Sequence, residues 1–197
     1  RLASCVVFKA MKPSKKDYKR FNSKTVVGPD DYASMKEVVG RRYRRMLEEE
    51  QPLPDLIIAD GGKGQMEVIR EVIQDELDLD IPIAGLAKDD RHRTNELLYG
   101  FPAIHVALKT DSELFHVLTH IQDEVHRFAI EFHRNKRSKR ALHSELDDIK
   151  GIGPKTRDEL LNALKSVKKI RETDIETLAN LIGKSKAQIV FEHFHKD

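Results

Sequence analysis

The sequence has a single cysteine, Cys5, and no long uninterrupted apolar run. One cysteine cannot form an internal disulfide, so a disulfide scaffold is excluded and the chain fits a reducing compartment. No apolar stretch approaches the length that crosses a bilayer, and no signal-peptide pattern is visible. We therefore expect a cytoplasmic protein that makes no use of a membrane.

The chain also lacks a strong net charge, because 35 Lys and Arg residues stand against 33 Asp and Glu residues. Such a balance says little about partners, whereas the distribution of the charges says more. Basic residues gather in two runs, at 41–45 and at 134–140. Runs of this kind can bind phosphates, but they also occur on ordinary solvated helix faces, and both interpretations stay open.

What is present is enough material for a folded core. The chain has 197 residues, of which 39% are hydrophobic and 35% are charged, so one medium domain and one small domain fit. The first residue is Arg1 rather than Met, and it stands almost inside a strand-like run. We expect further chain upstream of it.

Hydrophobic periodicity predicts alternating strands and helices over the first 140 residues. The β-branched run 2–8 and the alternating stretch 17–25 are expected to pair as strands. Asp30 or Asp31 is expected to cap a helix that runs to about Glu50. The following elements are predicted in turn: a strand at 56–59 buried on both faces, a helix at 65–77, a strand at 81–86 and a hairpin at 92–108.

A long helix is predicted to begin near Ser112, because apolar residues from Leu114 to Phe132 recur every three or four positions in one buried stripe. We expect the basic run 134–140 to be an exposed tail and linker. From Ser144 onward the pattern changes to short helices broken by glycine. A mixed α/β part followed by an all-α part predicts two domains, with a boundary near 140–146.

Asp60 is the strongest candidate for chemistry in the first part. It ends an apolar strand and opens the turn Gly61-Gly62-Lys63-Gly64, and ligands of open α/β sheets gather at the carboxyl ends of strands. The glycines would allow positive φ and close backbone approach around a metal ion or phosphate. Two other interpretations are weighed: a nucleotide P-loop, whose spacing is absent, and an aspartate that only caps the next helix.

His126 is a second candidate, because it flanks the buried stripe of the long helix instead of facing open solvent. From its spacing alone it could be a metal ligand, a general acid or base, or a histidine with only a structural role. His116 and His120 stand four residues apart and could hold zinc, although no H-E-x-x-H pattern accompanies them.

The second part contains a glycine-rich hairpin between two helices. Gly151-Ile152-Gly153-Pro154-Lys155 would present backbone N–H groups at a helix start, which bind phosphate without reading bases. Leu181 to Ser185 is a weaker copy. The candidate DNA-binding residues are glycines of the two turns and the cations beside them: Gly151, Gly153, Lys155, Arg157, Gly183 and Lys184.

With these motifs assembled, the chain resembles the UvrC family of bacterial nucleotide-excision-repair nucleases, in its C-terminal half. Four stretches carry the resemblance, of which the second and third are long and specific: 28–35 (GPDDYASM), 53–65 (LPDLIIADGGKGQ), 121–130 (IQDEVHRFAI) and 151–155 (GIGPK).

The resemblance implies an RNase H-like α/β fold, with a mixed sheet and flanking helices, over 1–142, and a small all-α tandem helix-hairpin-helix domain over 144–197. It implies that Asp60 is the second of two catalytic aspartates, that His126 is the catalytic histidine, and that both bind Mg²⁺ or Mn²⁺. The family's first aspartate would lie upstream of Arg1, so residues 1–197 by themselves are expected to be inactive.

The implied activity is metal-dependent hydrolysis of a phosphodiester, giving the 5′ incision beside a lesion. The implied partners are damaged double-stranded DNA and a UvrB–DNA complex, whose contact segment would lie in the N-terminal half of the family. Two competing functions remain: a non-catalytic DNA-binding or recruitment module, and a structure-specific, resolvase-like nuclease.

Overall fold

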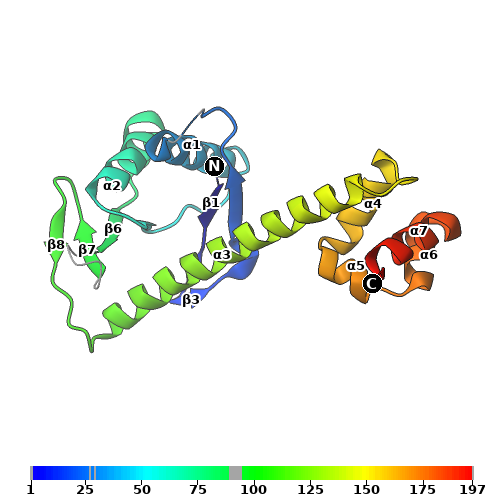
Figure 1. Cartoon of the computed structure of the whole chain (residues 1–197). Coiled ribbons are helices and arrows are strands. Elements are labelled where there is room, and N and C mark those ends of the chain that lie inside the picture. Colours follow the sequence, from blue (N-terminus) through cyan, green and yellow to red (C-terminus); the bar gives the residue numbers. More distant parts are fainter. Residues whose placement is uncertain (1, 27, 29, 89–94, 197) are drawn as a thin grey trace. The chain divides into compact units, whose positions relative to one another are not determined.

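The computed structural model describes residues 2–26, 28, 30–88 and 95–196. The chain forms two compact units, Arg1–Ala129 and Ile130–Asp197, and one helix, α3 (Glu113–Asp147), contributes to both (Figure 1). Pro29 and the expected start of the hairpin at His92 lie outside the described residues. Within the described residues, no helix is both long and apolar enough to cross a membrane.

Two short antiparallel pairs open the first unit. Strand β1 (Leu2–Cys5) pairs with β4 (Lys19–Asn22), which confirms the predicted pairing in its central part. The predicted strand 2–8 is wrong beyond Cys5, because Phe8 belongs to a separate small hairpin of β2 (Phe8–Lys9) and β3 (Lys12–Pro13). A 3-10 turn, η1 (Lys15–Asp17), leads from this hairpin to β4.

Helix α1 (Asp31–Glu48) begins where the sequence predicts. The Asp30 side chain caps it by accepting a hydrogen bond of 2.9 Å from the Ala33 N–H. Glu37 on α1 holds the preceding loop, since its carboxylate accepts hydrogen bonds from the Ser23 hydroxyl and the Lys24 N–H. These hydrogen bonds lower the pKa of Glu37 to about 2.

The main sheet is mixed and has the order β5-β6-β7-β8 in the described part of the chain. Strand β5 (Ile57–Ala59) pairs parallel with β6 (Ile83–Lys88), and β7 (Asn95–Tyr99) and β8 (Ile104–Val106) complete the sheet as an antiparallel hairpin. The prediction that residues 56–59 are buried on both faces is wrong, because Ile57 and Ile58 are only partly buried and Ala59 alone of the strand is fully buried. Leu56 lies outside the strand and is 45% exposed.

Helix α2 (Lys63–Arg70) and a π-helical turn, η2 (Glu71–Glu76), connect the two parallel strands. They pack with α1 on the sheet and form the core of the first unit, which confirms the flanking helices expected from the sequence. The buried members of this core are Tyr43, Ala59, Met66, Ile69, Ile73, Ile81, Ile83 and Leu98.

Helix α3 buries Leu118 and Phe128, but Leu114 at its start is 47% exposed, so the predicted stripe is interrupted there. The run 134–140 is exposed, as predicted, but it continues the helix instead of forming a separate tail and linker. It contains no glycine or proline and consists mainly of good helix formers. It leads directly to Leu142 and Leu146, which are buried in the core of the second unit.

The second unit packs the end of α3 with four short helices: α4 (Pro154–Leu164), α5 (Val167–Glu172), α6 (Ile175–Ile182) and α7 (Lys184–Phe194). The predicted change from mixed α/β to all-α structure is therefore confirmed, while the division into 1–142 and 144–197 stays a prediction. The buried residues of the second core are Leu142, Leu146, Ile149, Leu160, Leu164, Ile170, Leu178, Ala187, Val190 and Phe194.

Candidate functional site

Asp60 follows β5 immediately and lies at the carboxyl end of that strand. Its side chain does not cap α2, because the capping residue is Gly62 and no side chain accepts a hydrogen bond from the first turn of that helix. This finding excludes the interpretation of Asp60 as a simple helix cap. The Asp60 side chain is 41% exposed, so it remains accessible to a ligand.

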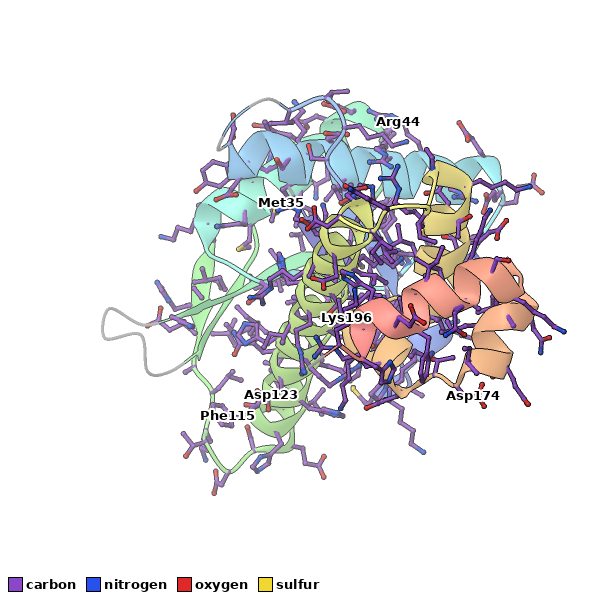
Figure 2. All side chains as sticks on the ribbon, turned by 45° about the vertical axis from the view of Figure 1, so that its right-hand side comes forward. Met35, Arg44, Phe115, Asp123, Asp174 and Lys196 are labelled. Atoms are coloured by element: carbon purple, nitrogen blue, oxygen red, sulfur yellow. The ribbon has the colours of Figure 1, made fainter. Side chains whose placement is uncertain are left out.

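Two side chains of α3 meet the Asp60 carboxylate, one at each oxygen. His126 Nε2 lies 3.5 Å from Asp60 Oδ2, as the sequence argument expected. Gln122 Nε2 donates to Asp60 Oδ1 at 3.4 Å. The two α3 residues are one helical turn apart, so side chains from a single face of the helix contact both oxygens. Gln122 is buried, at 7% exposure, whereas the adjacent Asp123 is exposed (Figure 2).

These residues border an open pocket of about 450 Å³. Its lining combines the turn after β5, the end of β6 and the α3 face: Asp60, Gly61, Gly62, Leu86, Ala87, Lys88, Gln122 and His126. Sequence reasoning did not select Lys88 or Gln122. Gln122 could have been found from its position four residues before His126, and Lys88 from its position at the carboxyl end of the strand that neighbours β5.

The glycines near the pocket serve close packing. A Cβ on Gly85 of β6 would lie 2.7 Å from the Gly61 carbonyl oxygen, and a Cβ on Gly64 would lie 2.3 Å from the Tyr32 hydroxyl. These glycines therefore allow close packing within the protein, while the predicted close approach to a metal ion or phosphate stays a prediction. The positive φ predicted for this turn is wrong, because the glycines with positive φ among the described residues lie elsewhere, at Gly28, Gly100, Gly151 and Gly183.

The pair Asp60 and His126 suits a divalent metal ion by the chemistry of its donors. A carboxylate oxygen and an imidazole nitrogen face each other at the mouth of a pocket, and both are ligands of Mn²⁺, while the carboxylate suits Mg²⁺. In the described part of the chain, no three His, Cys, Asp or Glu side chains gather as a ready metal site. His120 of the considered zinc pair packs edge-on against the Phe8 ring, with 5.3 Å between ring centroids.

The first glycine hairpin lies between the end of α3 and the start of α4. Gly151 has a φ of +90°, which glycine adopts without strain, and Gly153 is the N-cap of α4. No side chain caps this helix, so the N–H groups of its first turn are left for another acceptor. Pro154 at the first helical position is typical of such a start.

The second hairpin has the same features in shorter form. Gly183 alone joins α6 to α7, with φ +86° and ψ 156°, and it is also the uncapped start of α7. In contrast, α5 and α6 are capped by Ser166 and by Asp174, which is labelled in Figure 2. The hydrogen bonds from Thr177 lower the pKa of Asp174. The two hairpin helices α4 and α7 are thus the uncapped ones among the four.

Side chains from the two hairpins contact each other. Lys186 Nζ donates to Thr156 Oγ1 at 3.0 Å, and the position of a Cβ on Gly151 is 3.2 Å from Ile189 Cδ1. Arg157, which the sequence predicted to contact phosphate, forms an ion pair with Asp147, and this pair partly neutralises the guanidinium charge. Lys155 and Lys184, by contrast, are exposed at the starts of α4 and α7.

Comparison with known proteins assigns both units. Residues 1–130 match the family model described as the UvrC RNAse H endonuclease domain, and residues 144–195 match the SAM-like helix-hairpin-helix tandem. The fold class expected from the sequence agrees with these two matches.

Curated relatives are similar over nearly the whole chain. The UvrABC system protein C of Bacteroides thetaiotaomicron is 68% identical over 189 residues, or 96% of this chain. The proteins of the same name from two Bacteroides fragilis strains are 65% identical over 191 residues, or 97% of this chain. In each case the chain spans 31% of the length of the relative.

Proposed function

Because this chain belongs to the UvrC family, we propose that it forms the part of a bacterial excision-repair nuclease that makes the 5′ incision beside a DNA lesion. The observation that carries the proposal is the meeting of Asp60 and His126 at the carboxyl end of β5, 3.5 Å apart. The reaction would be hydrolysis of one phosphodiester in a strand of damaged duplex DNA, in the bacterial cytoplasm.

Asp60 and His126 would hold Mg²⁺ or Mn²⁺, which when bound supplies a Lewis acid and a water of lowered pKa for phosphodiester hydrolysis. Asp60 would contribute the negative charge. Gln122 would keep the carboxylate oriented by donating to Oδ1, so that Oδ2 stays directed toward His126. Lys88, at the pocket rim, would attract the phosphate of the strand to be cut.

We further propose that another carboxylate completes this site, as the family resemblance implies, and that residues 1–197 by themselves do not cut. The test compares residues 1–197 with a version extended at its N-terminus, on a duplex with one lesion, in the presence of the other repair components and Mg²⁺. We expect cutting by the extended protein alone. Efficient incision by residues 1–197 would refute the need for a further ligand, while no incision by either protein would favour a non-catalytic module.

The second unit would bind DNA through the backbone without reading bases. The uncapped starts of α4 and α7 offer N–H groups, and Lys155 and Lys184 add charge beside them. We propose damaged double-stranded DNA as the ligand, presented in a UvrB–DNA complex. Binding without base readout suits lesions that occur at any sequence.

Gln122 provides a test of the metal site that does not depend on cutting. We expect Gln122→Leu to weaken Mn²⁺ binding roughly 10- to 100-fold, because residues that orient a metal ligand typically contribute this much. The affinity would be measured by calorimetric titration of Mn²⁺ into the extended protein. Asp123→Asn, one position further along α3 but exposed, is the control and should bind Mn²⁺ as the wild type does. If Gln122→Leu binds Mn²⁺ as tightly as the wild type does, Gln122 does not orient the metal ligand.

A further inference from the structure

The stretch 133–143 of α3, called the α3 stem below, is rich in positive charge and contains no acidic residue that could neutralise it. It contains five cations, two histidines and no Asp or Glu: Arg134, Lys136, Arg137, Lys139 and Arg140, with His133 and His143. All five cations are exposed. The stem lies in the second unit, and Leu142 near its end and Leu146 just after it are buried in the core of that unit.

Most of the arginines that the structure describes outside the stem are neutralised locally. Six of them pair with a carboxylate within the described residues: Arg41, Arg44, Arg45, Arg70, Arg127 and Arg157. Arg134, Arg137, Lys139 and Arg140 have no carboxylate within 4.0 Å in the part of the chain that the structure describes. The charge of these four residues is therefore available to an external partner.

The cations of the stem also act against each other. Arg134 and Arg137 are three residues apart, as are Arg137 and Arg140, and Lys136 stands four residues before Arg140. Like charges at these spacings lie side by side on a helix and destabilise it. The segment 133–141 buries no side chain in either core to offset this repulsion. A polyanion bound along the stem would offset this repulsion, because each cation would lie close to a negative charge.

The pattern favours a nucleic-acid backbone over a protein surface. The cations are spread around the helix, since successive residues are turned by about 100°. Between Phe132 and Leu142 the only apolar side chain is Ala141. A protein interface needs apolar anchors at its centre, whereas phosphate contacts need only cations and give no sequence preference.

We propose that the α3 stem is a DNA-binding surface in its own right, which contacts phosphates of the duplex in addition to those held by the two hairpins. The inference rests on the proposed function, in that the ligand is the DNA that the nuclease cuts. The stem supplies affinity that is strongly dependent on salt, and the hairpins supply the fixed backbone contacts.

The test uses the full chain with Arg134→Gln, Arg137→Gln and Arg140→Gln combined, since glutamine keeps a high helix propensity. A matched control removes the same charge from exposed positions on α5, with Lys168→Gln, Lys169→Gln and Arg171→Gln. Binding to duplex DNA is measured by fluorescence anisotropy from 50 to 200 mM salt. Because each phosphate contact contributes about 0.9 to the salt slope, we expect the slope to fall by up to about three and the affinity to fall on the order of tenfold.

Three results decide the inference. A smaller salt slope in the stem variant supports the inference, provided that the control keeps the slope of the wild type and that circular dichroism shows unchanged helicity in both variants. If the salt slope and the DNA affinity fall equally in the stem variant and in the α5 control, the stem contributes only general electrostatic attraction, and the inference is overturned. DNA affinity retained in the stem variant but lost in Gly153→Val also overturns it, while leaving DNA binding by the hairpins intact. Absence of DNA binding by the wild type would refute the DNA-binding function itself.

Discussion

Asp60→Asn is expected to lower 5′ incision by roughly a thousandfold or more, in a protein that joins this chain to the N-terminal part found in its relatives. The substitution keeps the shape of the side chain and removes its negative charge. Asparagine can still accept the hydrogen bond from Gln122, but its other terminal atom becomes an amide nitrogen, which cannot bind a cation. Incision of a lesion-containing duplex is measured by gel electrophoresis of the end-labelled strand.

The fold and the DNA affinity should survive this change. Asp60 is 41% exposed and does not cap α2, so no structural contact of the first turn is lost. Asp55→Asn is a suitable control, because Asp55 is exposed and precedes the same strand. Its incision rate should equal that of the wild type. Incision retained by Asp60→Asn at the rate of the control would refute the assignment of Asp60 as a metal ligand.

Gly153→Val is expected to lower DNA affinity on the order of tenfold, with a loss of stability of only about 1 kcal/mol from the poorer N-cap. The φ of Gly153 is −88° and its ψ is 176°, a conformation that any residue adopts, and a Cβ there meets no atom within 4 Å. The added side chain therefore projects into open space beside the uncapped start of α4. It would hold a phosphate away from the free N–H groups, which anisotropy with labelled duplex DNA can detect.

The matching change in the second hairpin has a different physical effect. Gly183 has φ +86° and ψ 156°, a region essentially limited to glycine, so Gly183→Val is expected to destabilise the fold by about 1–3 kcal/mol. The sequence predicted a smaller loss of DNA affinity at this weaker copy. That comparison is valid only at a temperature where both variants are folded, as checked by circular dichroism. A larger affinity loss at Gly183 than at Gly153 would reverse the ranking of the hairpins.

Much of the fold follows from local patterns in the sequence. The cap at Asp30, the extent of α1, the strand before Asp60 and the helices on either side of Gly183 are each encoded within a few residues. The predictions for the run 134–140 and for strand β5 failed because contacts with residues distant in the sequence determine their structure. The run 134–140 is helical because the same helix enters the core of the second unit at Leu142. The partial burial of Ile57 and Ile58 on β5 depends on what packs on the two faces of the sheet, which the residues of the strand do not specify.

The sequence alone identified the candidate site residues: a carboxylate after a strand, a histidine beside an apolar stripe, and glycines between short helices. The tertiary structure added contacts that no local pattern predicts. The hydrogen bond from Gln122 to Asp60 joins residues 62 positions apart, and the contact between Lys186 and Thr156 joins two hairpins. Contacts of this kind depend on how helices dock, and docking is set by the whole core rather than by the residues near either partner.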